Sequence, residues 1–389
     1  MPDNQGLSHL SDHFLIVAVV LYSLAVIAFA ADFAFGRRGP AVSRAGAGVR
    51  HRVPATVGAG AGALDDDGAD GAAMGSAAVD TSAPASGAGA SGAVTGGAGA
   101  SGPGASRAGD DGAGDGGAAG GGAVATGQRG RTDVPPGRLV RIALVLTTAG
   151  VALHLTGVVT RGLAVHRVPW GDMYEFVISV SCVAVLVFLG LMIKYRPYHL
   201  GLFFLAPIVI IMGLAQTVIY TPAGPLVPAL NSYWLAIHVT AMTLASGTFM
   251  VAAVLAVVYL FAERHTRRVA AGLSSRYGEV FRLLPSAERL DQIAYRTVVF
   301  AFPIWTFGIM AGAIWADEAW GRYWGWDPTE TWAFITWVVY ACFLHARVTA
   351  GWRGRRAALI QLVGFGCLLF NLLGVSLFIT GLHSYAGLS

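Results

Sequence analysis

The sequence predicts an all-α protein, a polytopic integral membrane helical bundle with about eight transmembrane helices. Hydrophobic residues make up 55% of its 389 residues, and charged residues only 12%. Several apolar runs reach about 20 residues, the length of a helix that crosses a bilayer. Basic residues lie beside these runs rather than in one patch, so nucleic acid is not an expected partner, whereas the lipid bilayer is.

The chain begins with a predicted transmembrane helix within residues 1–36. Its apolar run, Phe14 to Phe35, follows a segment without Lys or Arg and precedes Arg37 and Arg38. A secretory signal carries its positive charge before a shorter apolar run. We therefore expect an uncleaved helix whose N-terminus lies outside the cell.

Residues 37–136 are dominated by Gly, Ala, Ser and Asp, with few large apolar side chains. Such a segment cannot bury enough surface to offset the entropy lost on ordering. We expect a disordered linker on the cytoplasmic side, with no functional site in it.

The predicted membrane core occupies residues 137–389. Its apolar segments lie at about residues 139–160, 174–194, 200–220, 233–262, 293–315, 330–350 and 357–380. If these spans alternate in direction, most arginines and the single lysine fall on one side of the membrane. The other side carries only Arg161, Arg167 and Arg322, so the positive-inside rule places the arginine-rich side in the cytoplasm.

The longest ordered inner loop, residues 263–292, is basic and is expected to contain a short helix at the membrane surface. Ser286 follows Pro285 and suits a helix N-cap, with Glu288 in the first turn. Anionic lipid of the inner leaflet accounts for the arginines of this loop.

Two histidines are predicted at the same membrane depth. His238 lies just inside the outer end of its span, and His383 lies just past the outer end of the last one. A dense run of tryptophans from Trp305 to Trp337 reaches the same depth. Neutral imidazoles on opposite sides of a flat, aromatic slot suit the axial positions of a haem iron, so we expect haem b to bind here.

A third histidine, His345, is predicted near the inner face. It lies about 15 residues, or about 22 Å, from the outer start of its helix. His154 differs from it in depth by roughly 10–15 Å, whereas two trans axial nitrogens are only about 4 Å apart. If His345 binds an inner haem iron, its partner is His199 or a histidine of another chain, which we favour.

The tryptophans are densest in the predicted outer loop, about residues 315–330, which reads "WGRYWGWDPTE" near its end. Asp327 suits a helix N-cap, Pro328 the first turn, and Glu330 completes a capping box. The helix is therefore expected to begin there, with Trp320, Trp324 and Trp326 in the preceding loop. Gly321 and Gly325 allow its backbone to turn and to approach a ligand closely.

The pattern W-G-x-x-W-x-W-D, formed by Trp320, Gly321, Trp324, Trp326 and Asp327, resembles the WWD domain of the CcsA family, also named ResC and in some genomes CcsB. The resemblance extends over residues 139–389, including "NSYWLAIHV" around His238 and "GLHSYAG" around His383. Members of this family form the haem-handling half of the System II cytochrome c synthetase.

This resemblance implies a role for each matching residue. His238 and His383 are similar to the external axial ligands of haem iron, and the five residues of the motif are similar to the haem cradle. His345 resembles the transmembrane histidine of haem passage, whose second ligand comes from a ResB-type membrane partner. The resemblance also implies a bacterial plasma membrane, an extracytoplasmic WWD loop and an apocytochrome c client with a C-x-x-C-H motif. The roles of His154 and His166 are not implied, and Glu175 is interpreted as an ion-pair partner of Arg161 or Arg167.

The expected activity is presentation of haem for thioether attachment, as part of a holocytochrome c synthase complex. No residue is an obvious acid or base for that addition, so no catalytic residue is assigned. One alternative is a haem transporter or scaffold without attachment activity. Another, of a different class, is an aromatic-lined transporter or a glycan-binding membrane protein.

Overall fold

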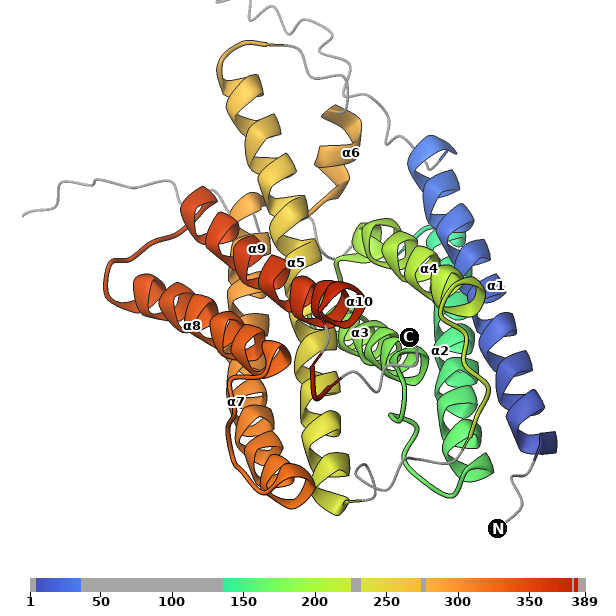
Figure 1. The fold of residues 1–389 in the computed structure, drawn as a ribbon. Helices are drawn as coiled ribbons and strands as arrows, with labels where there is room; N and C mark the ends of the chain where they lie inside the picture. Colours follow the sequence, from blue (N-terminus) through green and yellow to red (C-terminus); the bar gives the residue numbers. More distant parts are fainter. Residues whose placement is uncertain (1–4, 36–135, 225–231, 274–277, 380, 384–389) are drawn as a thin grey trace, which may run out of the picture. The chain divides into compact units, whose positions relative to one another are not determined.

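The computed structural model describes residues 5–35, 136–224, 232–273, 278–379 and 381–383, which all belong to one compact unit. The described residues form helices and no strands (Figure 1). The predicted linker lies outside the described residues, except for Pro136. Within the described residues, eight helices have the length and composition to cross a membrane, which confirms the predicted fold class of a multi-pass helical membrane protein.

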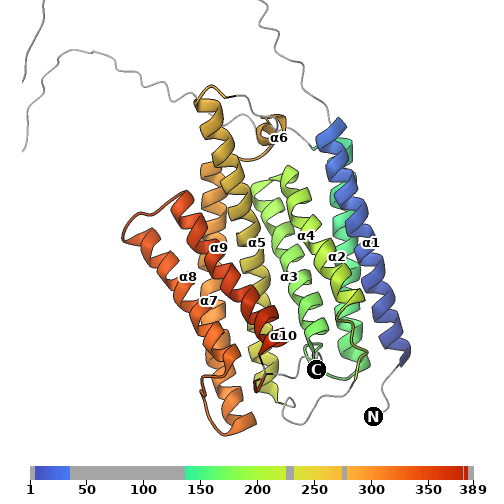
Figure 2. The same ribbon diagram turned by 45° about the horizontal axis from the view of Figure 1, so that its top comes forward.

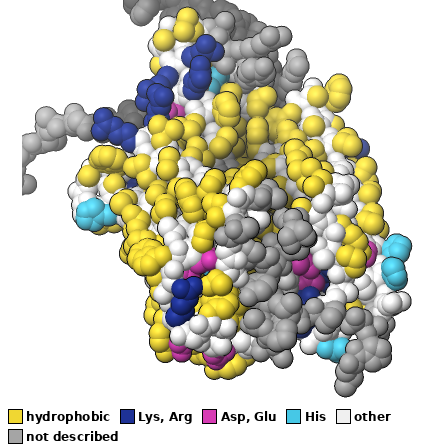
Figure 3. Space-filling model, viewed as in Figure 1, with side chains coloured by type: hydrophobic (Ala, Val, Ile, Leu, Met, Phe, Trp, Pro, Cys, Tyr) yellow, Lys and Arg dark blue, Asp and Glu magenta, His cyan; other side chains and the backbone are white. Residues whose placement is uncertain are grey.

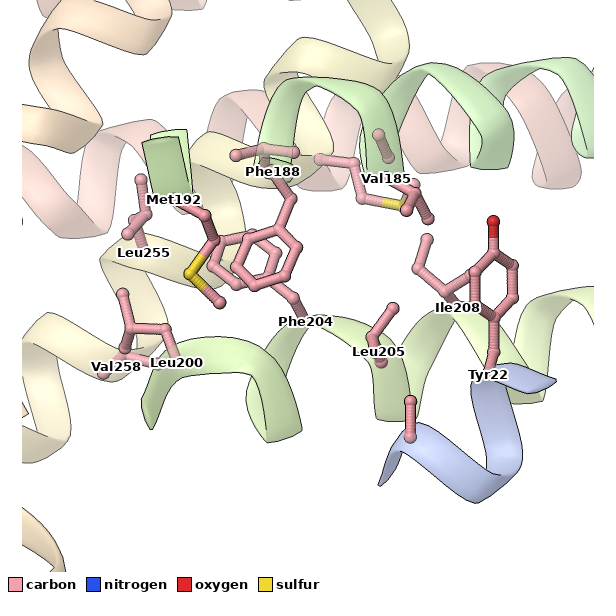
Figure 4. Close-up of a cluster of buried hydrophobic side chains, with 14 of the residues drawn as sticks. Tyr22, Val185, Phe188, Met192, Leu200, Phe204, Leu205, Ile208, Leu255 and Val258 are labelled. Carbon is pink, nitrogen blue, oxygen red and sulfur yellow. The ribbon is translucent and has the colours of Figure 1, made fainter. Parts of the chain in front are cut away.

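The first half of the bundle comprises α1 (Gln5–Phe35), α2 (Arg138–Ala164), α3 (Met173–Tyr195) and α4 (Gly201–Thr217). A 3-10 turn at Tyr198–Leu200 precedes α4. Helix α1 lies along α2 and also contacts α4 (Figure 2). Their core includes stacked Phe188 and Phe204, whose ring centroids are 4.3 Å apart (Figure 4). Burying such apolar side chains between helices packs this half together.

The second half comprises α5 (Tyr233–Ala270), α6 (Gly278–Leu283), α7 (Ala287–Trp320), α8 (Pro328–Val348) and α9 (Arg355–Leu369). A π-helical segment, Phe370–Val375, and the short α10 (Ser376–Phe378) follow α9. Helix α5 packs against α3 on one side and against α7 and α9 on the other, so it joins the two halves (Figure 2). Its buried stretch is rich in small residues, which allow helices to approach closely within a membrane.

The loop at residues 263–292 does contain a short helix, α6. Ser286 also caps a helix, since its side chain accepts a hydrogen bond from the Arg289 N–H, but that helix is α7 and not the short one. One expectation about a helix boundary is wrong. Helix α7 continues to Trp320, so this tryptophan is helical rather than in the loop. Helix α7 ends where Gly321 adopts φ of 68° and donates its N–H to the Asp317 carbonyl.

The two ends of the bundle differ in their charged residues. The end that carries residues 321–327, called here the loop end, holds a buried ion-pair cluster. Arg161 is fully buried and donates to Glu175 at 2.9 Å, while Arg167 donates to the same carboxylate at 2.6 Å. The prediction that Glu175 pairs with Arg161 or Arg167 is confirmed for both arginines. Asp12 of α1 lies 3.5 Å from Arg161, so the cluster joins α1, α2 and α3.

Between the two ends, the outer surface of the bundle is mostly apolar. In Figure 3, hydrophobic side chains cover much of the visible face, and Lys and Arg gather at the top, around the end of α5. This pattern matches a helical bundle whose sides face lipid and whose basic end faces a membrane surface.

Candidate functional site

A cavity at the loop end lies among α5, α7, α8 and the π-helical segment. It has a volume of about 60 Å³ and is partly open to the surface. His238 and His383 both line it, although they are far apart in the sequence. The other lining residues are mostly apolar or aromatic: Met242, Ile309, Gly312, Ala313, Trp315, Ala316, Tyr323, Trp324, Thr329, Glu330, Ala333 and Asn371.

His238 is fixed from the side of α7. Its Nδ1 lies 2.7 Å from the carbonyl oxygen of Gly308, and because a carbonyl only accepts, this nitrogen carries the proton. Gly312 provides the space for the ring, since a Cβ there would lie 2.6 Å from Nδ1. The Nε2 atom of the neutral ring therefore keeps its lone pair, which is the state that binds a metal.

His383 is fixed by a carboxylate. Its Nδ1 lies 2.8 Å from Oδ2 of Asp327, and Oδ1 of the same carboxylate accepts from the Leu382 N–H at 2.7 Å. Although burial opposes it, hydrogen bonds from His383 and Leu382 lower the pKa of Asp327 below its ordinary value. The carboxylate therefore stays an acceptor, which leaves Nε2 of His383 as the atom available to a metal.

Trp315 contacts both histidines, stacked on His238 and edge-on to His383. Its ring centroid is 6.1 Å from that of His238, with the planes nearly parallel, and 5.8 Å from that of His383. Trp320 packs behind it, 4.8 Å from Trp315 and 5.1 Å from His383, without lining the cavity. The tryptophans thus fix the orientation of both imidazoles as well as forming one wall.

The loop from Gly321 to Asp327 is held by a capping box. Asp327 caps α8 by accepting from the Thr329 N–H at 3.2 Å, and Glu330 accepts from the Asp327 N–H at 3.1 Å. This confirms the predicted start of the helix at Pro328. Gly325 lies in contact with the Arg322 guanidinium and has no positive φ. Because this exposed, flexible side chain can move, the contact does not by itself require glycine.

Trp324 and Trp326 of the loop differ in position. Trp324 is half-buried and lines the cavity, whereas Trp326 is 66% exposed and does not. Trp326 also has φ of 57°, a left-handed conformation that costs a bulky residue about 1–3 kcal/mol. Gly321, at the end of α7, is exposed and does not line the cavity either.

His345 lies at the opposite end of α8 from this cavity, as its predicted depth requires. Its side chain is exposed, and it faces outward on the same side of α8 as Phe334 and Val338, which are 40% and 37% exposed. Nearby Arg347 pairs with Asp291 at 2.8 Å, which ties α8 to α7. The structure therefore does not bring His345 together with His238 and His383.

The remaining membrane histidines lie in the first half of the bundle. His154 is fully buried, and its Nδ1 lies 3.3 Å from the Tyr22 hydroxyl. His199 lies 3.5 Å from Asp32 at the arginine-rich end. Neither lines the cavity at the loop end. Among the described residues, no group of three or more His, Cys, Asp or Glu side chains could hold a metal ion.

Sequence analysis did not assign Trp315, Gly312 and Asn371 to the site. Asn371 is only 4% exposed, lines the cavity, and its Oδ1 has no hydrogen-bond partner among the described residues. A polar residue inside an apolar span was a usable signal, because such residues are expensive in a membrane. The spacing of Gly308 and Gly312 was another, since small residues four apart let helices approach.

The fold and this site define a class: polytopic helical membrane proteins with two histidines in an aromatic cavity at one end of the bundle. Residues 170–383 match the family model described as cytochrome C assembly protein, more than half of the chain. The chain belongs to this family and has a role in cytochrome c maturation.

Relatives support the same assignment. The chain is 36% identical over 249 residues to the cytochrome c biogenesis protein CcsA of Heterosigma akashiwo, covering 57% of this chain and 77% of the relative. The CcsA of Gloeobacter violaceus is 34% identical over 290 residues, covering 62% and 86%. That of Chlamydomonas reinhardtii is 44% identical over 163 residues, covering 42% and 43%.

Proposed function

We propose that this protein is the haem-handling subunit of a cytochrome c synthetase, and that it holds haem b at the loop end with His238 and His383 as axial ligands. One observation carries the proposal. Both histidines line one cavity, and each has its Nδ1 engaged by an acceptor, which leaves Nε2 for iron. Metal-binding histidines are oriented in this way in proteins generally.

The cavity walls suit the faces of a porphyrin better than a sugar or an ion. Trp315, Trp324 and apolar side chains of α7 and α8 form most of the lining. Among the ionisable residues that line the cavity, Glu330 already accepts hydrogen bonds from the Gly325 and Asp327 amides. A glycan or ion site would need several convergent polar groups, so the transporter and glycan-binding alternatives have less support.

Haem loading requires the loop to move. The cavity volume of about 60 Å³ is smaller than the roughly 300–1,000 Å³ of pockets that enclose drug-sized ligands. Tyr323 and Trp324 lie on the short loop between α7 and α8, before the part that Glu330 holds at the Gly325 and Asp327 amides. We propose that haem enters as Tyr323 and Trp324 move away from α5 and the π-helical segment.

In the proposed reaction, a client apocytochrome presents the two thiols of its C-x-x-C-H motif to the vinyl groups of the bound haem. Each thiol adds across one vinyl double bond: sulfur bonds to one carbon, and the thiol hydrogen ends on the other. The addition needs no oxidant or reductant. The protein contributes by positioning the haem, since none of the described side chains that line the cavity is placed as a free acid or base.

His345 marks the proposed docking face of a ResB-type partner. An imidazole exposed on the membrane-facing side of α8 is costly in lipid, and a partner chain that supplied a second iron ligand would remove that cost. Haem would then pass from this inner site to the cavity at the loop end. The positive-inside rule supports a loop end outside a bacterial plasma membrane.

Co-expression in a host without its own haem attachment system tests the proposal. The chain with a ResB-type partner is expected to yield covalent cytochrome c, and His238→Ala or His383→Ala to abolish it. If the chain binds haem but covalent product never forms with the partner present, the protein is a haem transporter or scaffold. If no haem is bound at all, the proposal is wrong.

A further inference from the structure

Trp326 lies beside the exposed part of the cavity wall, called here the mouth, which Tyr323 and Trp324 form, but does not itself line the cavity. Its ring meets that of Trp324 edge-on, with centroids 5.7 Å apart, and Trp324 does line the cavity. On its other side the ring of Phe334 is 6.2 Å away. Most of the indole remains exposed, so it forms a surface next to the opening.

The local structure holds Trp326 in this position. Its φ of 57° is unusual for a bulky residue. The amides on both sides are bound by one carboxylate, because Glu330 accepts from the Gly325 N–H at 2.9 Å and the Asp327 N–H at 3.1 Å. Thr331 donates to the Trp326 carbonyl at 3.3 Å. A strained backbone that its neighbours hold in place is typical of functional sites.

We propose that Trp326 is a docking residue for the apocytochrome polypeptide and not part of the haem pocket. This rests on the proposed function, because a client must reach haem held between His238 and His383. The mouth is its route, and Tyr323, which lines the cavity and is 60% exposed, extends the aromatic surface there. Aromatic side chains are the usual anchors of protein interfaces. A tryptophan that only marks the lipid interface needs the right depth but no strained backbone.

Replacing the indole without disturbing the loop tests the proposal. Trp326→Gly removes the ring and readily adopts a positive φ, whereas Trp326→Phe keeps an aromatic ring. Tyr233→Ala is the matched control, because Tyr233 is also 66% exposed at the loop end but does not line the cavity. The full chain is expressed with its membrane partner and a client. The haem spectrum of the purified complex and the yield of covalent cytochrome are measured.

The Gly variant is expected to keep the haem spectrum of the wild type and to lose at least about tenfold in covalent yield. The Phe variant and the control are expected to keep most of the yield. Loss of the spectrum in Trp326→Gly would assign the indole to the haem pocket, and an unchanged yield would assign it to the lipid interface; either overturns the proposal. Trp326→Asn, which also tolerates a positive φ, repeats the test if the glycine variant does not accumulate. A wild type without haem refutes the proposed function instead.

Discussion

At the residue scale, Asp327 connects the capping of α8 to the position of His383. The same carboxylate caps the helix and accepts from the histidine and from the Leu382 amide. Sequence analysis assigned the cap correctly, because a cap depends on residues close in the chain. The contact with His383 spans 56 residues, so no local pattern could predict it.

Asp327→Asn is expected to weaken haem binding about 10–100-fold, because His383 loses the charged acceptor that orients its ring. The reduction potential of the bound haem should rise as well, since the imidazole becomes a weaker donor. Haem titration and a potentiometric titration measure these effects. Asp317→Asn, at the same end of the molecule, is the control. Equal affinity and potential in the two variants would refute a positioning role.

Asp172 provides a pH test at the loop end. It caps α3, and burial together with the nearby Glu175 carboxylate raises its pKa to about 6. Because the pKa of Asp172 is higher in the folded than in the unfolded protein, its protonation stabilises the fold at pH values below the ordinary carboxyl pKa. This contribution is lost as the pH rises through about 6. Asp172→Asn keeps the capping oxygen, so it should be more stable than the wild type by about 1–3 kcal/mol at pH 8 and equal at pH 4. Thermal unfolding in detergent at both pH values checks this. A variant that is less stable at pH 8 would contradict it.

At the element scale, the close approach of α5 and α7 determines where His238 lies. A Cβ on Gly308 would lie 2.6 Å from the Met242 sulfur, and one on Gly312 would lie 2.6 Å from the His238 ring. The sequence predicted both spans from the length of their apolar runs. The register between the two helices was not predictable, since it depends on which small residues meet across the interface.

Gly312→Ala is expected to displace the His238 ring and to reduce haem binding at least about tenfold, because the ring can no longer keep its bond to the Gly308 carbonyl. Gly366→Ala in α9 is the matched control, since no atom lies within 4 Å of its added Cβ. The control should keep full binding and gain about 0.5–1 kcal/mol in helix stability. Haem titration of both variants, with thermal unfolding, separates binding from folding. Full haem binding by Gly312→Ala would show that His238 does not need its present position.

The end of α9 is the least predictable element. The π-helical segment Phe370–Val375 follows α9 directly, and Asn371 of that segment lines the cavity. Single π-helical turns often occur at functional sites. The sequence there is continuously apolar apart from Asn371, so nothing distinguishes a π-helical turn from an α-helical one.

At the scale of the whole molecule, the buried ion-pair cluster joins the N-terminal helix to the core. Arg161 of α2 contacts Glu175 of α3, Asp12 of α1 and, through its guanidinium, the ring of Tyr174 at 4.8 Å. Sequence analysis predicted the ion pair with Glu175 but not the contact with α1, because residues 37–136 separate Asp12 from the core. The cluster thus brings together helices that the sequence treats as separate regions.

Glu175→Gln is expected to destabilise the protein by about 3–5 kcal/mol, because it leaves two arginines without their shared carboxylate in a buried site. Glu263→Gln is the control, since Glu263 pairs with an Arg267 that is 67% exposed, and such pairs contribute about 0.5 kcal/mol or less. Thermal unfolding in detergent and accumulation in the membrane measure both. Similar losses in the two variants would show that the cluster does not hold the bundle together.

The central claim is that His238 and His383 hold haem iron together at the loop end, and an absorption spectrum tests it most directly. The purified complex is measured oxidised and reduced, for the wild type, His238→Ala, His383→Ala and His345→Ala. We expect a bis-histidine haem spectrum that either of the first two variants loses and added imidazole restores, with the outer site intact in His345→Ala. A colourless wild type supplied with haem and its partner, or a spectrum unchanged in both outer variants, would contradict the claim.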